Sequence, residues 1–169
     1  MRKAFTLIEM MVATVILVVL MLFLYKSYGS LNRSNSLLSS ESQKVQKLEE
    51  LKKTLFLDVT LAKKVVVQNE SSQEDVLFLQ TSHSLYRRFE PYVAYIVKEK
   101  KLYRLESLKE FKEYPLAADN EFVAEELTEV KSFRIYPAKN EQLHLYLIHT
   151  VLENGEEILL KTKALNKEE

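Results

Sequence analysis

Apolar residues crowd the first part of the chain and afterwards recur in short runs. Residues 5–25 are almost wholly apolar, and Glu9 is the only charged residue among these 21 positions. A helix of that length is about 31 Å long, close to the ~30 Å hydrocarbon core of a bilayer. The pattern predicts one membrane-spanning helix. Glu9 is anomalous there, because a carboxylate at mid-membrane costs about 2.5–3.5 kcal/mol.

After the span, polar residues take over, and no proline occurs before Pro91. An apolar stripe then advances in steps of three or four residues: Val45, Leu48, Leu51, Leu55, Val59 and Ala62. Such spacing indicates an amphipathic helix. We expect residues 26–63 to continue the first helix and to rest its second half on a domain. A coiled coil is the alternative, although the repeat covers fewer than three heptads.

From residue 64 onward the chain turns to β-prone runs. Strands are predicted at residues 65–68, 76–80, 92–97, 101–105, 130–136, 142–152 and 157–164. Asn154-Gly155 favours a type I′ turn between the last two strands, and residues 98–100 are expected to join another hairpin. The fold class is therefore α+β, with a long N-terminal helix packed on an antiparallel β domain of residues 64–169.

The residues before the span form a short basic leader. Arg2 and Lys3 favour a cytoplasmic amino terminus by the positive-inside tendency. A secretory signal has its small-residue cleavage site after the apolar core. Here the small residue, Ala4, comes before the core, and residues 21–30 offer no convincing A-x-A site. The apolar helix is therefore expected to be retained.

The order of basic leader, Ala4, Phe5-Thr-Leu-Ile-Glu9 and apolar helix resembles the class III leader of type IV pilins and pseudopilins. The resemblance implies a pilin-like fold and cleavage by prepilin peptidase between Ala4 and Phe5. The family usually has glycine where this chain has Ala4. Leader residues 1–4 would be lost and Phe5 methylated at its new amino group. Glu9 matches the family's glutamate, whose carboxylate faces the amino terminus of a neighbouring subunit during assembly. The alternative is a plain single-span anchor in which Glu9 snorkels to the headgroups.

The later elements resemble J-type minor pseudopilins of type II secretion, in residues 51–58, 76–79, 92–105 and 130–136. This implies a pseudopilus subunit, at or near the tip, that serves protein export and is not an enzyme. Its partners would be prepilin peptidase, other pilins or pseudopilins, and the bacterial inner membrane, with the C-terminal domain in the periplasm. Two alternatives stay open: a minor pilin of a type IV pilus or DNA-uptake machine, and an anchored periplasmic binding domain that never assembles.

Composition narrows the chemistry further. Basic and acidic residues number 24 each, and loss of Arg2 and Lys3 leaves 22 basic residues, so the chain has no strong basic footprint for nucleic acid. The absence of cysteine excludes disulfides, and two glycines are too few for a glycine-rich phosphate loop.

No catalytic residue, cofactor or metal site is predicted. The three histidines, His83, His144 and His149, form no metal signature, and the last two are expected on opposite faces of one strand. An acidic patch is interpreted as a solvated face rather than a calcium site: Asp119, Glu121, Glu125, Glu126 and Glu129. Four aromatic residues are expected mainly in the core, with a sticky surface as the alternative: Tyr86, Phe89, Tyr92 and Tyr95.

Overall fold

The computed structural model describes residues 7–69, 74–116, 121–140 and 143–165. The chain divides into two units, Met1–Leu48 and Glu49–Glu169. One helix, α1 (Leu7–Thr60), supplies all the regular structure described in the first unit and the first element of the second. Residues 27–42, which are rich in serine and asparagine, are continuous helix. The helix ends at Thr60, slightly before the predicted residue 63, because β1 already begins at Ala62.

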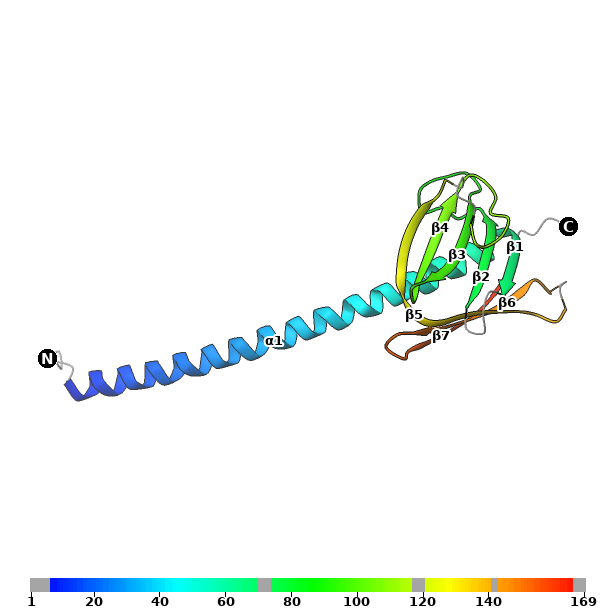
Figure 1. Cartoon of the computed structure of the whole chain (residues 1–169). Coiled ribbons are helices and arrows are strands. Elements are labelled where there is room, and N and C mark those ends of the chain that lie inside the picture. The colour runs from blue at the N-terminus through cyan, green and yellow to red at the C-terminus, as the bar shows by residue number, and fades with distance from the viewer. Residues whose placement is uncertain (1–6, 70–73, 117–120, 141–142, 166–169) are drawn as a thin grey trace. The chain divides into compact units, whose positions relative to one another are not determined.

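The second unit is built on a seven-stranded antiparallel sheet in sequential order (Figure 1). Its strands are β1 (Ala62–Asn69), β2 (Asp75–Thr81), β3 (Tyr92–Lys98), β4 (Lys101–Ser107), β5 (Val123–Pro137), β6 (Leu145–Leu152) and β7 (Glu157–Lys163). β5 is the long strand that joins the two parts of the sheet: its first half pairs with β4 and its second half with β6. The expected α+β fold, a long helix packed on an antiparallel sheet, is thereby confirmed.

The first half of β5 was not predicted as a strand from the sequence. Residues 123–129 carry three glutamates, Glu125, Glu126 and Glu129, and acidic residues are depleted in strands. Their strand conformation is supported by cross-strand partners on β4. Lys101, for example, forms an ion pair of 2.9 Å with Glu126. Opposite charges across a strand pair stabilise it, which offsets the poor intrinsic propensity.

The turn between β6 and β7 differs in type from the one that its sequence favours. Asn154-Gly155 was predicted to form a type I′ turn, which needs positive φ at both central residues. Only Gly155 has positive φ, at 86°, and its N–H donates to the Leu152 carbonyl at 3.0 Å. With Leu152 N–H donating to Glu156 at 2.9 Å, this is a three-residue loop whose last residue is glycine. The prediction of a hairpin is correct, but its turn type is wrong.

The two-residue turn with positive φ lies instead between β3 and β4. Glu99 and Lys100 have φ of 52° and 63°, and Lys98 pairs directly with Lys101. Neither residue type favours positive φ. The register of seven paired positions along β3 and β4 imposes the turn, because a two-residue connection between right-twisted strands requires the primed geometry.

The apolar stripe of the helix enters the core only in its last turns. Leu51, Leu55 and Val59 are buried, whereas Val45 is exposed. Burial of such side chains contributes about 1.5–3 kcal/mol each. The stripe was therefore predicted correctly from Leu51 onward, and within the second unit it packs as expected.

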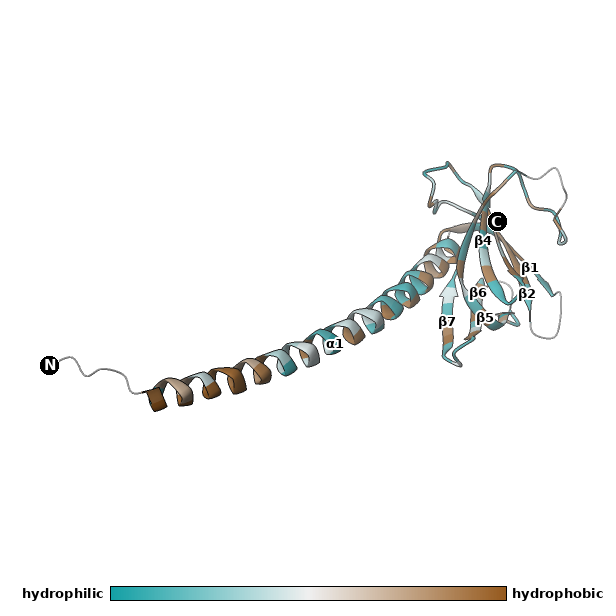
Figure 2. Ribbon diagram, turned by 60° about the vertical axis from the view of Figure 1, so that its left-hand side comes forward, coloured by the Kyte–Doolittle hydropathy of each residue, from teal (hydrophilic) through white to brown (hydrophobic). Residues whose placement is uncertain are grey.

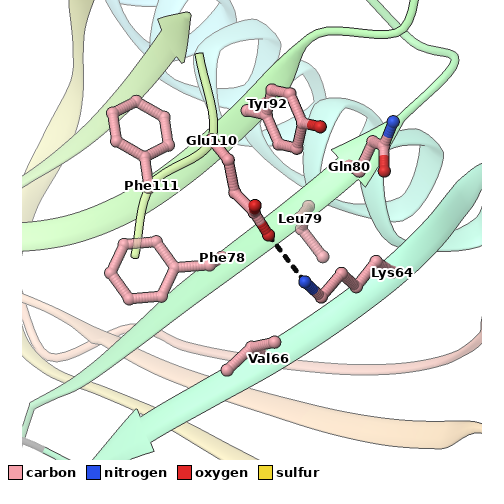
Figure 3. Close-up of a pocket in the computed structure, with 8 residues that line it drawn as sticks. All are labelled: Lys64, Val66, Phe78, Leu79, Gln80, Tyr92, Glu110 and Phe111. Carbon is pink, nitrogen blue, oxygen red and sulfur yellow. Dashed lines mark hydrogen bonds and ion pairs between the residues drawn. The ribbon is translucent and has the colours of Figure 1, made fainter. Parts of the chain in front are cut away.

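The opposite face of the sheet is covered by a connecting segment, residues 108–116, here called the strap. Phe111 of the strap joins Val76, Phe78, Ala94, Ile96 and Leu105 in one buried cluster. The Gln68 side chain pairs with the backbone of Tyr114, donating to its carbonyl and accepting from its N–H, both at 3.1 Å. Figure 3 shows Glu110 of the strap reaching Lys64 on β1 across a narrow opening beside Phe78.

Candidate functional site: the apolar turns of α1

The first described turns of α1 expose apolar side chains on every face. All residues from 7 to 26 are exposed, and the large apolar side chains among them are 54–81 % exposed. Figure 2 shows these turns in brown, the colour of hydrophobic residues. Apolar surface costs about 25 cal/mol per Å² when it stays in water. This surface requires lipid or other apolar helices around it.

Length and composition fit a membrane environment. Among the described residues, α1 is the one helix long and apolar enough to cross a membrane. Its polar residues within the apolar stretch are few, and Thr14 donates its hydroxyl to the helix itself, to the Met11 carbonyl at 2.8 Å. Such internal pairing satisfies a hydroxyl where no water is present. The stretch is suited to a single-pass anchor.

Glu9 lies in the first described turn of this helix. It is the one charged residue described between Leu7 and Tyr25. A carboxylate in the first turn interacts favourably with the helix dipole, which contributes about 0.3–1 kcal/mol. That is smaller than the cost of about 2.5–3.5 kcal/mol for a charge at mid-membrane. Glu9 is thus placed where a nearby positive charge would stabilise it.

The predicted processing site itself lies outside the described residues. Arg2, Lys3, Ala4 and Phe5 all fall in the range 1–6. Cleavage between Ala4 and Phe5, methylation of Phe5 and the role of Glu9 in assembly therefore stay predictions.

A second cluster, in the β unit, was missed by sequence reasoning. We call it the Asp58 network; its members are Asp58, His83, Tyr95, Arg104 and Glu106. Arg104 donates from Nε to Asp58 Oδ2 at 2.7 Å and from Nη2 to Oδ1 at 3.2 Å, so the pair is bidentate. The Tyr95 hydroxyl donates to Asp58 Oδ2 at 2.5 Å, and His83 Nδ1 lies 2.6 Å from Oδ1.

Burial makes these contacts mutually dependent. The side chains of Asp58 and Arg104 are both 0 % exposed. Burial lowers the pKa of the Arg104 guanidinium, but its hydrogen bonds to Asp58 and the charge of Asp58 outweigh burial and raise the pKa above its usual value. Burial also raises the pKa of the Tyr95 hydroxyl well above its usual range, with the negative charge of Asp58 adding to the effect. The network thus keeps Arg104 charged and Tyr95 neutral.

Glu106 connects the network to residues 82–91, the loop between β2 and β3. It accepts from Arg104 Nη1 at 2.7 Å and from the Ser84 hydroxyl at 2.6 Å. Ser84 Oγ in turn accepts the N–H of Arg88 at 2.8 Å. The arrangement ties the end of α1, strand β4 and this loop together through hydrogen bonds. Because Asp58 and Glu106 are fully buried and already hydrogen-bonded, the network is suited to holding the fold rather than to receiving a substrate.

A period-two signal for this cluster is present in the sequence. Leu102, Arg104 and Glu106 alternate along β4 and therefore point to the same face as buried Leu102. Asp58 lies three residues after Leu55 and seven after Leu51, so it shares the buried face of the helix with these leucines. A charge of each sign on two predicted core faces indicates a buried pair.

The remaining candidate residues are dispersed. His83 belongs to the Asp58 network, and His149 lies 3.4 Å from Glu157. His144 precedes β6 with φ of 47°, so the expectation that both later histidines lie in one strand is wrong. Asp119 falls outside the described residues. Among those described, no three or more histidine, aspartate or glutamate side chains gather as a metal site would require.

The aromatic residues divide between core and surface. Tyr95 is fully buried, in agreement with a core role, and Tyr92 packs against the cluster beneath the strap. Tyr86 and Phe89 lie in the loop between β2 and β3 and are 42 % and 87 % exposed.

Comparison with known proteins bears on the helix. Residues 1–25 match the family model described as the prokaryotic N-terminal methylation motif. The match supports the class of type IV pilins and pseudopilins, together with processing by a prepilin peptidase and assembly with other pilins. None of the curated proteins compared matches the chain.

Proposed function

We propose that this protein is a minor pseudopilin that assembles through α1 into the pseudopilus of a type II secretion system. The observation that carries the proposal is the continuous exposed apolar surface of residues 7–25, joined to a prepilin-type motif. A span that only anchored a domain would need no methylation motif. The J-type resemblance of residues 51–58, 76–79, 92–105 and 130–136 supports placement at or near the filament tip.

In this proposal the protein acts by assembly, not by catalysis. Prepilin peptidase cleaves between Ala4 and Phe5 and methylates Phe5. The new amino group has an ordinary pKa near 8, so it is cationic at neutral pH. In the filament it would lie against Glu9 of a neighbouring subunit, and pairing at low dielectric removes much of the cost of both charges. The helix spans the inner membrane, with the amino terminus in the cytoplasm and the β unit in the periplasm.

The first test is the intact mass of the full chain extracted from membranes, with and without prepilin peptidase. We expect loss of Met1–Ala4 and gain of one methyl group only when the peptidase is active. An unmethylated chain that still starts at Met1 beside an active peptidase would contradict the proposal and favour a plain anchor.

The second test replaces the charge within the span. Glu9→Leu is expected to leave membrane insertion intact. It should lower the amount of the protein in sheared filaments at least tenfold, which corresponds to about 1.4 kcal/mol or more. The matched control is Glu41→Leu, which removes an exposed carboxylate from the same helix, paired with Lys44 at 2.7 Å. Incorporation of Glu9→Leu at the level of this control would contradict a role of Glu9 in assembly, whereas absence of the natural chain from the filaments would indicate an anchored domain that never assembles.

A third test distinguishes a secretion system from a type IV pilus or DNA-uptake system. A minor pilin of a type IV pilus or DNA-uptake system shares the motif and the fold class. Deleting the gene should abolish export of secreted proteins if the protein serves secretion, and should abolish DNA uptake or twitching if it serves the alternative.

A further inference from the structure

A cleft of about 280 Å³ is formed where three segments of the β unit meet. They are the loop between β2 and β3, the junction of β4 with the strap, and the residues at the start of β5. The walls expose mainly apolar surface, and the apolar residues among them are Leu108, Phe122 and Val123. The Phe122 ring also contacts the buried ring of Phe111, with 6.4 Å between the ring centroids. The cleft therefore offers an apolar group a place out of water.

Ser107 fixes two sides of this cleft to each other. Its hydroxyl donates to the Glu121 carbonyl at 2.8 Å and accepts the backbone N–H of Lys109 at 3.0 Å. Ser107 is fully buried at the end of β4, and beside it Glu106 pairs with Val123 of β5. The protein's own hydrogen bonds thus form the cleft, and a ligand need not order these walls on binding, which favours affinity.

Two cations and one carboxylate also line the cleft: Arg88, Lys109 and Glu121. The side chains of Lys109 and Glu121 are exposed, and neither forms an ion pair with another described residue. The walls therefore carry one more positive than negative charge. By charge complementarity, the ligand that fits these walls carries one negative charge.

Arg88 is held at the cleft by the Asp58 network. Its Nη1 donates to the Glu106 carbonyl at 3.0 Å, and its backbone N–H donates to Ser84 Oγ at 2.8 Å. The Ser84 hydroxyl in turn donates to the buried Glu106 carboxylate at 2.6 Å. No further hydrogen bond joins this guanidinium to a described residue, so most of its five N–H donors remain for a ligand. A guanidinium with such donors pairs best with a carboxylate, to which it can donate twice.

We propose that this cleft binds a monocarboxylate that carries one large apolar group. Arg88 and Lys109 bind the carboxylate, and the apolar group packs on the apolar walls. Glu121 disfavours a ligand with a second negative charge, because like charges repel. Ligand pockets usually have volumes of about 300–1,000 Å³, so a cleft at the lower end of that range suits a ligand of roughly the size of one amino acid.

This chemistry occurs in small free acids and at the carboxyl terminus of a peptide, and the choice of probes distinguishes the two sources. The cleft shares no residue with the apolar turns of α1. The inference therefore goes beyond filament assembly and stands whether or not the chain is a pseudopilin.

N-acetyl-L-phenylalanine is the first probe, because it has a carboxylate, an apolar ring and one peptide unit. Four compounds each change one of these features. Its amide lacks the negative charge, and N-acetylglycine lacks the apolar group. Benzylsuccinate adds a second carboxylate, and phenylpropanoate keeps the ring and one carboxylate but lacks the peptide unit.

The experiment follows backbone amide signals of the full chain in detergent micelles by NMR while each probe is added. N-acetyl-L-phenylalanine should shift the amides of Lys109 and Val123 saturably, with a Kd of about 1 mM or below, and leave the amides of β7 unchanged. The amide, N-acetylglycine and benzylsuccinate should bind at least about tenfold more weakly. Because the uncharged amide enters micelles at least as readily as the acid, partition into detergent cannot account for this order.

Two pairs of variants test the cations. Arg88→Gln should weaken binding of the first probe by about tenfold or more, whereas Arg87→Gln, on an exposed neighbour outside the cleft, should not change it. Lys109→Gln should weaken binding by about threefold, since this ammonium is exposed, and Lys112→Gln on the same strap should have no effect. Unchanged amide signals of β3 and β4 verify that each variant is folded.

Tighter binding of N-acetyl-L-phenylalanine than of phenylpropanoate supports the proposal and assigns the site to a peptide carboxyl terminus. Equal or tighter binding of phenylpropanoate supports it and assigns the site to a small free acid. No saturable shift up to about 10 mM probe, equal binding of the amide or of benzylsuccinate, or unchanged binding in both Arg88→Gln and Lys109→Gln would each overturn the proposal.

Discussion

Two of the carboxylates on helix α1, Glu9 and Asp58, have opposite surroundings. Glu9 lies on an exposed, almost wholly apolar stretch of α1, whereas Asp58 is fully buried near the end of the same helix. The surroundings of Asp58 come from its own chain: Arg104, Tyr95 and His83 all reach its oxygens within 3.2 Å. The apolar surface around Glu9 is what the chain leaves for lipid or other helices. Assembly is the role that we propose for the first carboxylate, and the contacts of the second hold the fold together.

The largest effect expected on the folded β unit comes from breaking the buried pair. Arg104→Met removes the guanidinium and leaves Asp58 buried without its bidentate partner, which should lower the free energy of unfolding by about 3–5 kcal/mol. Chemical denaturation of the full chain in detergent, followed by tyrosine fluorescence, measures the change.

The matched control is the double variant Asp58→Leu with Arg104→Met, which removes both charges. It should recover part of the lost stability, because Asp58 no longer remains as a buried charge without its partner, while Glu106 still lacks Arg104 as in the single variant. A double variant less stable than the sum of the two single variants predicts would show that the pair is not the dominant interaction.

Substitution of two leucines on α1 tests the same difference between its exposed and its buried part. Leu55 is 0 % exposed and Leu24 is 61 % exposed. Leu55→Ala should destabilise the β unit by about 2–5 kcal/mol through lost burial and a cavity. Leu24→Ala should change its unfolding free energy by less than about 0.5 kcal/mol. Equal effects of the two substitutions in the same denaturation assay would contradict the division of α1 into an assembling and a folding part.

The sequence predicted most of what depends on local pattern. The apolar run, the stripe from Leu51 to Ala62 and the hairpin of β3 and β4 are visible as periodicity and turn spacing. The first half of β5 was not, because its glutamates have low strand propensity and are stabilised by residues of β4 that lie about 25 positions earlier, such as Lys101 with Glu126. The turn types at Asn154-Gly155 and Glu99-Lys100 were also set by strand register, which local residue preferences do not contain.

The candidate site divides in the same way. The leader motif and Glu9 are contiguous in sequence and could be recognised there. In the Asp58 network, Asp58 of the helix contacts residues 25, 37 and 46 positions later, which lie in a loop, β3 and β4. Nothing in a single window specifies such contacts, and the sequence analysis did not predict them.

The smallest effect is expected from Tyr95→Phe, which tests whether the Tyr95 hydroxyl of the Asp58 network stays neutral in the folded chain. Burial raises the pKa of Tyr95 well above its usual value of 10, so the folded chain keeps this hydroxyl neutral where the unfolded chain ionises it. The stabilising contribution is fully present below pH 10 and is lost as the pH rises through the raised pKa, at up to about 1.4 kcal/mol per pH unit. Tyr95→Phe should therefore be less stable than the natural chain at pH 8, because the hydrogen bond to Asp58 is missing, but should lose stability less steeply above pH 10. Denaturation midpoints measured from pH 8 to pH 11 give both slopes. Parallel slopes would mean that Tyr95 ionises as readily in the folded chain as in the unfolded one, contrary to its full burial beside a carboxylate.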